Sequence, residues 1–339
     1  MTMTLNLSPN LQMPAADSGS RASAPRAYRG EVPLTLPLRH RGEATVTLRY
    51  ELAGREGAPL LIVAGGISAG RHTVSSAEFA EEGWWQAQAA ILDQSAYRIL
   101  SIDWLGADGL LDVPIDPSDQ ATAFVQLLDE LRLGPAQAFI GASYGGMVGM
   151  HVAALHPERI GALLAISAAA SAHPYSSACR SLQRRAVALG ESAGDEAAGV
   201  ALARSLAMLT YRTPEEFADR FAADPAVDSG IVRVAAEDYL DHHGARHCRR
   251  MSAAAYRRLS ESIDLHRIDP NAIAVPLTLV AVDSDALVPA TDVRSLADAV
   301  AGARFHLLQS RYGHDAFLKE EGQVAAVITD FLETLEPAQ

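Results

Sequence analysis

Ser143 is the residue whose surroundings most suggest chemistry, because it lies in the run Gly141-Ala142-Ser143-Tyr144-Gly145. An apolar stretch precedes this run and a helix-like segment follows it, which is the setting of a G-x-S-x-G turn between a strand and a helix. Glycines permit the close backbone approach of such a turn, and the turn exposes the serine hydroxyl. A glycine-rich loop that contains an ordinary serine is the alternative. The strand–turn–helix context favours a nucleophile.

A serine hydroxyl is a weak nucleophile unless a base and an orienting carboxylate activate it. Both types follow later apolar runs: Asp283 and Asp285 come after "PLTLVAV", and His314 comes after "RFHLL". The chain order serine, acid, histidine is that of enzymes with a nucleophilic turn of this kind. Alone, each aspartate could form a turn and the histidine could lie on a surface loop, but their order favours a catalytic triad. Local sequence does not choose between Asp283 and Asp285.

Two backbone amides are candidates for an oxyanion hole, the pair of donors that stabilises a tetrahedral intermediate. One is the N–H of Tyr144, directly after the serine, and the other is expected in the loop after an early strand. The segment "LIVAGGISAGRH" contains that loop, in which Gly65 and Gly66 let the backbone turn inward and leave the N–H of Ile67 as the donor. A glycine-rich turn without a ligand is the alternative.

The elements that must position these residues are predicted by hydrophobic patterning. Two alternating segments, "EVPLTLPL" and "ATVTLRYEL", predict half-buried antiparallel strands. Short continuous apolar runs follow, separated in several places by helical stretches such as 120–133 and 145–155, and runs of this kind suit parallel strands covered on both faces. The pattern indicates an α/β fold with a mostly parallel sheet flanked by helices. The runs are "PLLIVAGG", "YRILSIDWLG", "AQAFIGAS", "IGALLAIS", "PLTLVAVD" and "ARFHLLQS".

The chain consists of three kinds of region. Residues 1–27 are rich in Ser, Pro and Ala without a sustained period and predict a disordered tail. Residues 28–169 and 270–339 carry the β-α alternation and form the predicted core. Residues 170–269 are dominated by Ala, Arg, Glu and Leu at helical spacing, with no segment that predicts a strand. Because the alternation resumes afterwards, we expect a helical lid inserted before the last strands.

Composition excludes several classes of function. The 339 residues carry a net charge of −13 without a block of basic residues, which argues against a nucleic-acid or membrane-surface binder. No apolar run reaches the length of a membrane span, and the N-terminus lacks a signal-peptide pattern. Cys179 and Cys248 form no CxxC pair, as is usual in a reducing compartment, so we expect a cytoplasmic protein. We expect no metal site, although the spacing of His242, His243 and His247 is loosely metal-like.

Several segments together resemble the homoserine O-acyltransferase family of the α/β-hydrolase superfamily. The resemblance spans roughly residues 45 to 335, and its Tyr-Arg lid motif and Gly-His-Asp-Ala-Phe-Leu motif are far more specific than G-x-S-x-G. It implies an α/β-hydrolase fold. The segments are "IGASYGGMVGMHVAALHPERI", "GGISAGRH" with "GWW", "SLAMLTYRTPEEFADRF", "EDYLDHHGARH", "YRRLSESIDLH", "VDSDALVP" and "YGHDAFL".

The resemblance implies Ser143 as nucleophile, Asp285 as triad acid and His314 as base. It also implies Arg212 at the mouth of the pocket, where it could pair with a carboxylate, and Asp315 near the substrate amine. The implied reaction moves an acyl group from acetyl-CoA or succinyl-CoA, through an acyl-serine, to the hydroxyl of L-homoserine, the first committed step of methionine biosynthesis. The resemblance implies a homodimer without a bound cofactor. Serine O-succinyl transfer in cysteine biosynthesis and ester hydrolysis are the alternatives.

Three departures from the family pattern lie around the pocket. Tyr144 replaces the methionine that usually follows the nucleophile, and Gly65, Gly66 and Ile67 replace His-Ala-Leu in the oxyanion loop. The segment "DWLGADGLLDVP" stands where the family has Gly-Thr-Thr-Gly-Pro. These changes affect the assignment of the substrate more than the assignment of the triad.

A basic cluster formed by Arg180, Arg184 and Arg185 could meet the phosphates of CoA. A solvated helix face is the simpler interpretation of such a cluster, and we expect that.

Overall fold

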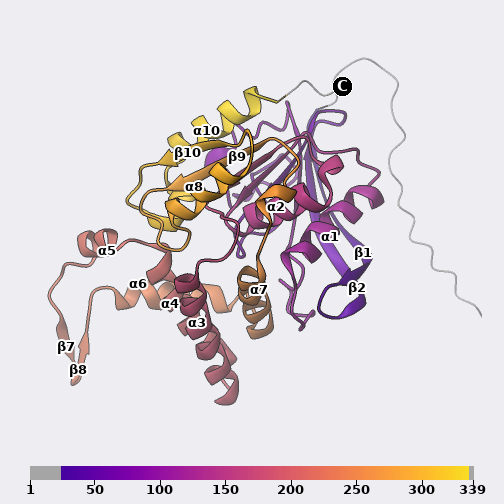
Figure 1. Cartoon of the computed structure of the whole chain (residues 1–339). Helices are drawn as coiled ribbons and strands as arrows, with labels where there is room; N and C mark the ends of the chain where they lie inside the picture. Colours follow the sequence, from indigo (N-terminus) through magenta and orange to yellow (C-terminus); the bar gives the residue numbers. More distant parts are fainter. Residues whose placement is uncertain (1–23, 336–339) are drawn as a thin grey trace, which may run out of the picture.

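The computed structural model describes residues 24–335 of the chain. Most of the predicted tail, residues 1–23, lies outside the described part, and so do residues 336–339. The first strand begins at Arg26, two residues inside the stretch 1–27 that composition assigns to the tail. Figure 1 shows a central sheet with helices on both faces and a group of helices at one end.

An eight-stranded sheet forms the centre of the molecule, with strand order β1-β2-β4-β3-β5-β6-β9-β10. Strands β1, β2 and β4 pair antiparallel, and all the others pair parallel. Strands β3, β5, β6 and β9 are buried along their whole length, which explains their continuous apolar sequences. This confirms the predicted α/β fold class. The strands are β1 (Arg26–Leu38), β2 (Gly42–Gly54), β3 (Leu60–Ala64), β4 (Arg98–Ile102), β5 (Ala138–Ala142), β6 (Leu163–Ile166), β9 (Leu277–Val282) and β10 (Arg304–Leu308).

Helices cover the two faces of the sheet in separate sets. On one face α1 (Pro117–Glu130), α2 (Tyr144–Leu155) and α8 (Ala290–Ala299) pack on the apolar side chains of the strands. On the other face lie α10 (Glu321–Glu333) and the segment 84–92. The short elements at the site are η1 (Gln86–Gln88), η4 (Gly313–Asp315) and α9 (Ala316–Lys319), while η2 (Pro157–Arg159) and η3 (Pro270–Ala272) lie in connections.

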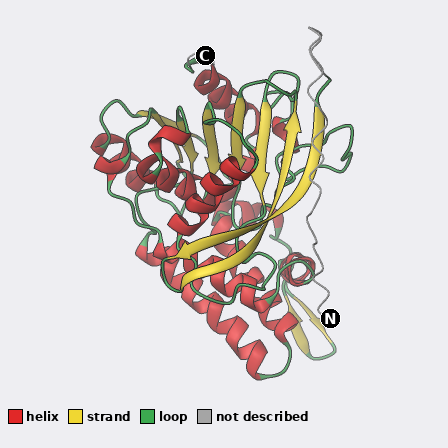
Figure 2. Cartoon of the chain, turned by 90° about the vertical axis from the view of Figure 1, so that its right-hand side faces the viewer, coloured by secondary structure: helices red, strands yellow, loops and turns green. Residues whose placement is uncertain are grey.

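The region predicted as a lid, which we call the lid region, contains five helices between β6 and β9, at one end of the molecule in Figures 1 and 2. Figure 2 also shows the long curved ribbon of β1 and β2 reaching down toward these helices. Helix α4 packs on both α3 and α6, so the lid region has a helical core of its own. The helices are α3 (Pro174–Ser192), α4 (Glu196–Tyr211), α5 (Pro214–Arg220), α6 (Glu237–Cys248) and α7 (Ala253–Leu265).

The lid region also contains a small hairpin, β7 (Ala226–Asp228) and β8 (Ile231–Arg233), so the expectation of a region without strands was wrong. Each strand has three residues, all exposed, which is too short for an alternating pattern to appear. Ser229 and Gly230 form the turn with φ of 51° and 83°, a left-handed conformation typical of tight hairpins. Throughout residues 24–335, no helix has both the length and the apolar character needed to span a bilayer.

Candidate active site

The serine turn has the strained geometry that its glycines predict. Ser143 has φ 54° and ψ −118°, and it immediately precedes α2. A Cβ on Gly145 would lie 2.1 Å from the carbonyl oxygen of Ala64, and one on Gly141 would lie 2.4 Å from the backbone of Gly145. Side chains are therefore excluded at both positions. The crowded backbone holds the serine in a conformation that L-residues rarely adopt, with its hydroxyl at the carboxyl edge of the sheet.

Three side chains predicted from sequence form a hydrogen-bonded chain at this edge. Ser143 Oγ lies 2.8 Å from His314 Nε2, and His314 Nδ1 lies 2.7 Å from Asp285 Oδ2. The second oxygen of Asp285 accepts hydrogen bonds from the amides of Leu287 and Val288 at 2.9 and 3.0 Å, which fixes the orientation of the carboxylate.

Asp283 has a different role from its neighbour. Its Oδ1 accepts a hydrogen bond from the amide of Ser310 at 3.0 Å, so this carboxylate joins the loops after β9 and β10. Of the two aspartates that the sequence left as alternatives, only Asp285 contacts His314.

His314 is 6% exposed and lies between aromatic rings. The ring of Tyr211 stacks on it with centroids 6.0 Å apart, and Phe317 meets it edge-on. Burial disfavours a charged imidazole, but the charge and hydrogen bond of Asp285 outweigh it and raise the pKa of His314 above its usual value. Asp285 therefore both orients the ring and stabilises its protonated form.

The two predicted oxyanion donors flank the serine. The amide of Tyr144 is the first of α2, and Ile67 follows Gly65, whose carbonyl accepts a hydrogen bond from the amide of Gly145 at 2.9 Å. Within residues 24–335, neither the Tyr144 nor the Ile67 amide donates a hydrogen bond to another group. Both are free to donate to a ligand oxygen near Ser143 Oγ.

Two of the departures from the family pattern contact each other. The side chain of Tyr144 is fully buried, donates or accepts a 2.6 Å hydrogen bond with Ser262 Oγ on α7, and meets Trp104 edge-on at 4.8 Å. The indole of Trp104 donates to the carbonyl of Gly66 at 3.0 Å. Tyr144 thus links the nucleophile turn to the lid region, and Trp104 supports the oxyanion loop. Sequence reasoning missed both roles, because the partners lie far apart in the chain.

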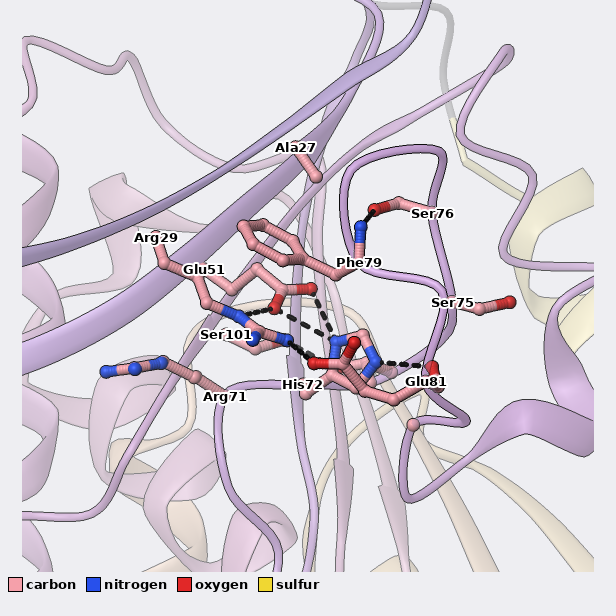
Figure 3. A network of polar contacts seen from close by, with 12 residues as sticks. Ala27, Arg29, Glu51, Arg71, His72, Ser75, Ser76, Phe79, Glu81 and Ser101 are labelled. Carbon is pink, nitrogen blue, oxygen red and sulfur yellow. Dashed lines mark hydrogen bonds and ion pairs between the residues drawn. The ribbon is translucent and has the colours of Figure 1, made fainter.

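A further polar network holds the loop after β3 against β1 and β2 (Figure 3). Glu51 is 3% exposed, and its carboxylate accepts from Arg29 Nε at 2.7 Å and lies 3.0 Å from His72 Nδ1. Arg29 also pairs with Glu81 at 2.7 Å, and the carbonyl of Glu81 lies 2.8 Å from His72 Nε2. Since His72 and Glu81 belong to the loop that carries Ile67, the network fixes the path of that loop.

Arg212 and Asp315, the predicted substrate-binding residues, contact each other. Arg212 Nε lies 2.9 Å from Asp315 Oδ2, and Arg212 Nη1 lies 3.0 Å from Glu216 Oε1. The Arg212 side chain is 9% exposed, so it is not a solvated helix residue. Burial raises the pKa of Asp315, and the charge of Arg212 opposes that shift. A ligand that reached this pair would meet a guanidinium and a carboxylate at adjacent positions.

Two adjoining cavities meet at the site. The smaller, about 200 Å³, is lined by Ser143, His314 and Arg180 among others. The larger, about 850 Å³, extends to α6 and includes Arg212. Residues that line both include Ile67, Ser68, Trp84, Arg204 and Asp315.

Arg180 and Arg184 do not form the solvated face that their sequence suggests. Arg180 Nη2 and Arg184 Nη1 each lie 2.7 Å from an oxygen of Asp264 on α7, and Arg180 is 11% exposed. Arg185 is exposed, as expected for a solvated face. This pairing could not be predicted from the local sequence, because the carboxylate is about 80 residues away.

Comparison with known proteins agrees with the geometry. A family model described as the alpha/beta hydrolase fold matches residues 58–321. A homoserine O-succinyltransferase of Xanthomonas campestris pv. campestris is 52% identical over 95% of this chain and 87% of its own. The chain belongs to the homoserine O-acyltransferase family. This confirms the family predicted from the sequence motifs and makes the chain an acyltransferase of a family that uses acyl-CoA.

Two further relatives support the same assignment. A homoserine O-acetyltransferase of Thermus thermophilus is 34% identical to this acyltransferase over 75% of this chain and 73% of its own. The crystal structure of homoserine O-acetyltransferase from Staphylococcus aureus superposes with a TM-score of 0.78 at 22% identity, over 93% of this chain and 97% of that one. The structural likeness confirms the α/β-hydrolase fold.

Proposed function

We propose that this acyltransferase is a homoserine O-succinyltransferase, which moves a succinyl group from succinyl-CoA to the hydroxyl of L-homoserine in the first committed step of methionine biosynthesis. The observation that carries the proposal is the 52% identity to the Xanthomonas homoserine O-succinyltransferase over 95% of the chain. An acetyl donor and a serine acceptor become the alternatives that experiment must exclude. The two free cysteines are in keeping with a cytoplasmic site of action.

In the first half-reaction, Ser143 is the nucleophile and His314 the base. The Ser143 hydroxyl gives its proton to His314 Nε2, and Oγ attacks the thioester carbonyl of succinyl-CoA. The amides of Ile67 and Tyr144 stabilise the oxyanion of the tetrahedral intermediate. Collapse breaks the carbon–sulfur bond, His314 returns the proton to the CoA sulfur, and a succinyl-serine ester remains. Asp285 stabilises the imidazolium that exists between the two proton transfers.

In the second half-reaction, the same groups act on the acceptor. The L-homoserine hydroxyl gives its proton to His314 Nε2, and its oxygen attacks the ester carbonyl of the succinyl-serine. Collapse releases O-succinylhomoserine, and His314 reprotonates Ser143 Oγ. Water competes for the same ester, so transfer depends on the helices of the lid region excluding it while the acceptor is held in place.

Arg212 and Asp315 suit the charged ends of an amino acid. The planar guanidinium of Arg212 keeps further N–H donors for the acceptor carboxylate, and Asp315 can accept from its ammonium group. Because the two side chains are already ion-paired at 2.9 Å, both are held in position before the acceptor arrives. This arrangement favours a zwitterionic acceptor over a simple alcohol.

Arg180 suits the second carboxylate of the succinyl group. It lines the smaller cavity together with Ser143, and the two guanidinium groups of Arg180 and Arg184 share the single carboxylate of Asp264. One positive charge is therefore left over on the wall of the cavity that receives the acyl group. An acetyl group has no second carboxylate to pair with that charge.

The donor and the acceptor are tested together by thiol release from acetyl-CoA and from succinyl-CoA, each with L-homoserine, L-serine or no acceptor. The proposal expects rapid release only with succinyl-CoA and L-homoserine. Release without an acceptor would identify a thioesterase. Release with acetyl-CoA would overturn the assignment of succinyl-CoA as the donor, and release with L-serine would overturn the assignment of L-homoserine as the acceptor.

The role of Arg180 is tested in the same assay with Arg180→Gln. We expect the KM for succinyl-CoA to rise about tenfold, the usual weight of one charge-assisted hydrogen bond. Arg185→Gln on the same helix is the matched control, since Arg185 is exposed and does not line the cavity. An equal effect of both substitutions would show that Arg180 does not bind the succinyl group of the donor.

We also propose that the chain forms a homodimer through the lid region. Leucines on α3 and α4 and apolar residues of the β7–β8 hairpin are exposed, which is costly for a monomer. Light scattering coupled to gel filtration is expected to give twice the mass of the chain. A monomer at micromolar concentration would contradict the proposal. These residues are Leu182, Leu189, Leu202, Leu209, Val227, Ile231 and Val232.

A further inference from the structure

Four cations line the larger cavity without a carboxylate partner among the described residues, 24–335. Arg204 lies on α4, Arg246 and Arg250 lie on and just after α6, and Lys319 ends α9. Within residues 24–335, none of the four takes part in an ion pair. Arg246, Arg250 and Lys319 are exposed, and Arg204 is half-buried beside the ring of Tyr211.

The acidic residues that line the same cavity are each ion-paired with an arginine. Arg49 pairs with Glu31 at 2.8 Å and with Asp108 at 3.3 Å. Asp103 pairs with Arg71 at 3.3 Å, and Asp315 is held by Arg212 as described. The wall near α6 therefore carries an excess of positive charge, although the whole chain has a net charge of −13.

The face of α6 toward the cavity is set by helical spacing. His243, Arg246, His247 and Arg250 follow one another at i, i+3, i+4 and i+7, and all four line the cavity, whereas Arg249 does not. Burial, with the nearby arginines, lowers the pKa of His243 to about 4 and that of His247 to about 3. At neutral pH these imidazoles are uncharged hydrogen-bonding groups beside fixed cations.

We propose that Arg204, Arg246, Arg250 and Lys319 bind the phosphate groups in the nucleotide half of CoA. The proposal rests on the proposed function, which requires an acyl-CoA with its thioester at Ser143. The cavity that contains Ser143 adjoins the cavity of these cations, and Trp84 and Arg204 line both. A thioester at the serine can thus be continuous, through the pantetheine arm, with phosphates at α6. Arginine and lysine are the side chains that pair best with phosphate oxygens.

These four cations are not the basic cluster that the sequence suggested for the phosphates of CoA, which was Arg180, Arg184 and Arg185. Arg180 and Arg184 share the carboxylate of Asp264, and Arg185 lines neither cavity. The four cations near α6, in contrast, take part in no ion pair with any residue of the described part of the chain. An alternative explanation, that basic residues stabilise the carboxyl end of α6, requires no ligand and predicts no preference between CoA and its fragments.

The test is calorimetric binding of CoA and of pantetheine, which lacks the nucleotide and its phosphates, to the full chain. We expect the wild type to bind CoA at least about tenfold more tightly than pantetheine, from charge-assisted contacts to phosphate. Arg246→Ala with Arg250→Ala is expected to abolish most of that preference, and Arg249→Ala, the matched control at the residue that directly follows α6, to retain it. 3′-Dephospho-CoA then distinguishes the 3′-phosphate from the diphosphate as the group bound.

The proposal is overturned if the wild type shows no preference for CoA or if the double variant keeps it. Failure of the proposed function has a different signature: CoA binds with the expected preference, but no homoserine-dependent thiol release occurs. Raising the salt concentration is expected to weaken CoA binding in the wild type and to leave pantetheine binding nearly constant.

Discussion

The inner pocket around Ser143 and the outer wall near α6 handle charge in opposite ways. At the inner pocket most charged groups have a partner: His314 has Asp285, Asp315 has Arg212, and Arg180 shares a carboxylate on α7 with Arg184. At the outer wall Arg246, Arg250 and Lys319 are exposed and have no ion-pair partner within residues 24–335. Burying an unpaired charge is very costly, whereas an exposed charge is solvated at little cost.

The difference indicates that the paired and the unpaired groups have separate functions. The paired groups are fixed in position before any substrate arrives, which is the condition for stabilising a transition state. The unpaired groups gain a partner only on binding, so they contribute affinity. Substitutions in the triad should therefore reduce kcat, and substitutions of the cations that bind a substrate group, at Arg212, Arg180 or the outer wall, should raise KM or Kd.

The largest expected effect is that of Ser143→Ala. Without the nucleophile, no covalent route exists, and we expect transfer to fall by at least about 10⁴-fold, as in other serine triads. Thiol release measures the rate, and a thermal melt close to that of the wild type serves as the folding control. A loss of less than tenfold would exclude the acyl-serine mechanism.

Asp285→Asn is expected to reduce kcat by about 10³- to 10⁴-fold, because the ring of His314 loses both its orientation and its counter-charge. Transfer requires neutral His314, whose pKa is raised in the wild type, so kcat/KM should fall as pH drops, beginning above pH 6.5, the usual histidine value. Removing the Asp285 charge lowers that pKa and should move the acid limb to lower pH. Asp283→Asn is the control, and an acid limb that does not move in Asp285→Asn would contradict the assignment.

Arg212→Lys is expected to raise the KM for L-homoserine by about 10- to 100-fold, since a single ammonium replaces a planar group that can hold a carboxylate at two points. The KM for succinyl-CoA should change much less. Arg220→Lys is the matched control, because Arg220 also pairs with Glu216, at 3.1 Å, but is 43% exposed and does not line the cavity. Equal effects of the two substitutions would indicate that Arg212 acts only through Glu216.

The smallest effect is predicted for Tyr144→Phe, which separates stability from catalysis in the inner pocket. It removes the hydroxyl bonded to Ser262 and leaves a buried polar group unpaired, so the free energy of unfolding should fall by about 1–2 kcal/mol. Urea denaturation measures this loss. The backbone amide proposed for the oxyanion hole is kept, so kcat should change less than in Asp285→Asn. A larger fall in kcat than in Asp285→Asn would show that the tyrosine hydroxyl itself takes part in the reaction.

Much of the architecture could be predicted from local patterns. Continuous apolar runs indicate buried parallel strands, and the glycines around Ser143 indicate a turn that crowds the backbone of Ala64. The short hairpin of residues 226–233 was missed because three-residue exposed strands carry no period.

Contacts between distant segments could not be predicted in the same way. The choice of Asp285 over Asp283 depends on how two loops meet after adjacent strands. The pairing of Arg180 with Asp264 depends on the packing of α3 against α7. Neither contact can be predicted from the local sequence, since the same side chains could be present whether or not the contact forms.

The central claim is tested most directly by intact-protein mass spectrometry after the enzyme is mixed with succinyl-CoA in the absence of an acceptor. We predict the added mass of one succinyl group, located on Ser143 by peptide mapping and discharged by L-homoserine with formation of O-succinylhomoserine. An enzyme that turns over both substrates without this adduct, or an adduct that L-homoserine does not discharge, would contradict the account.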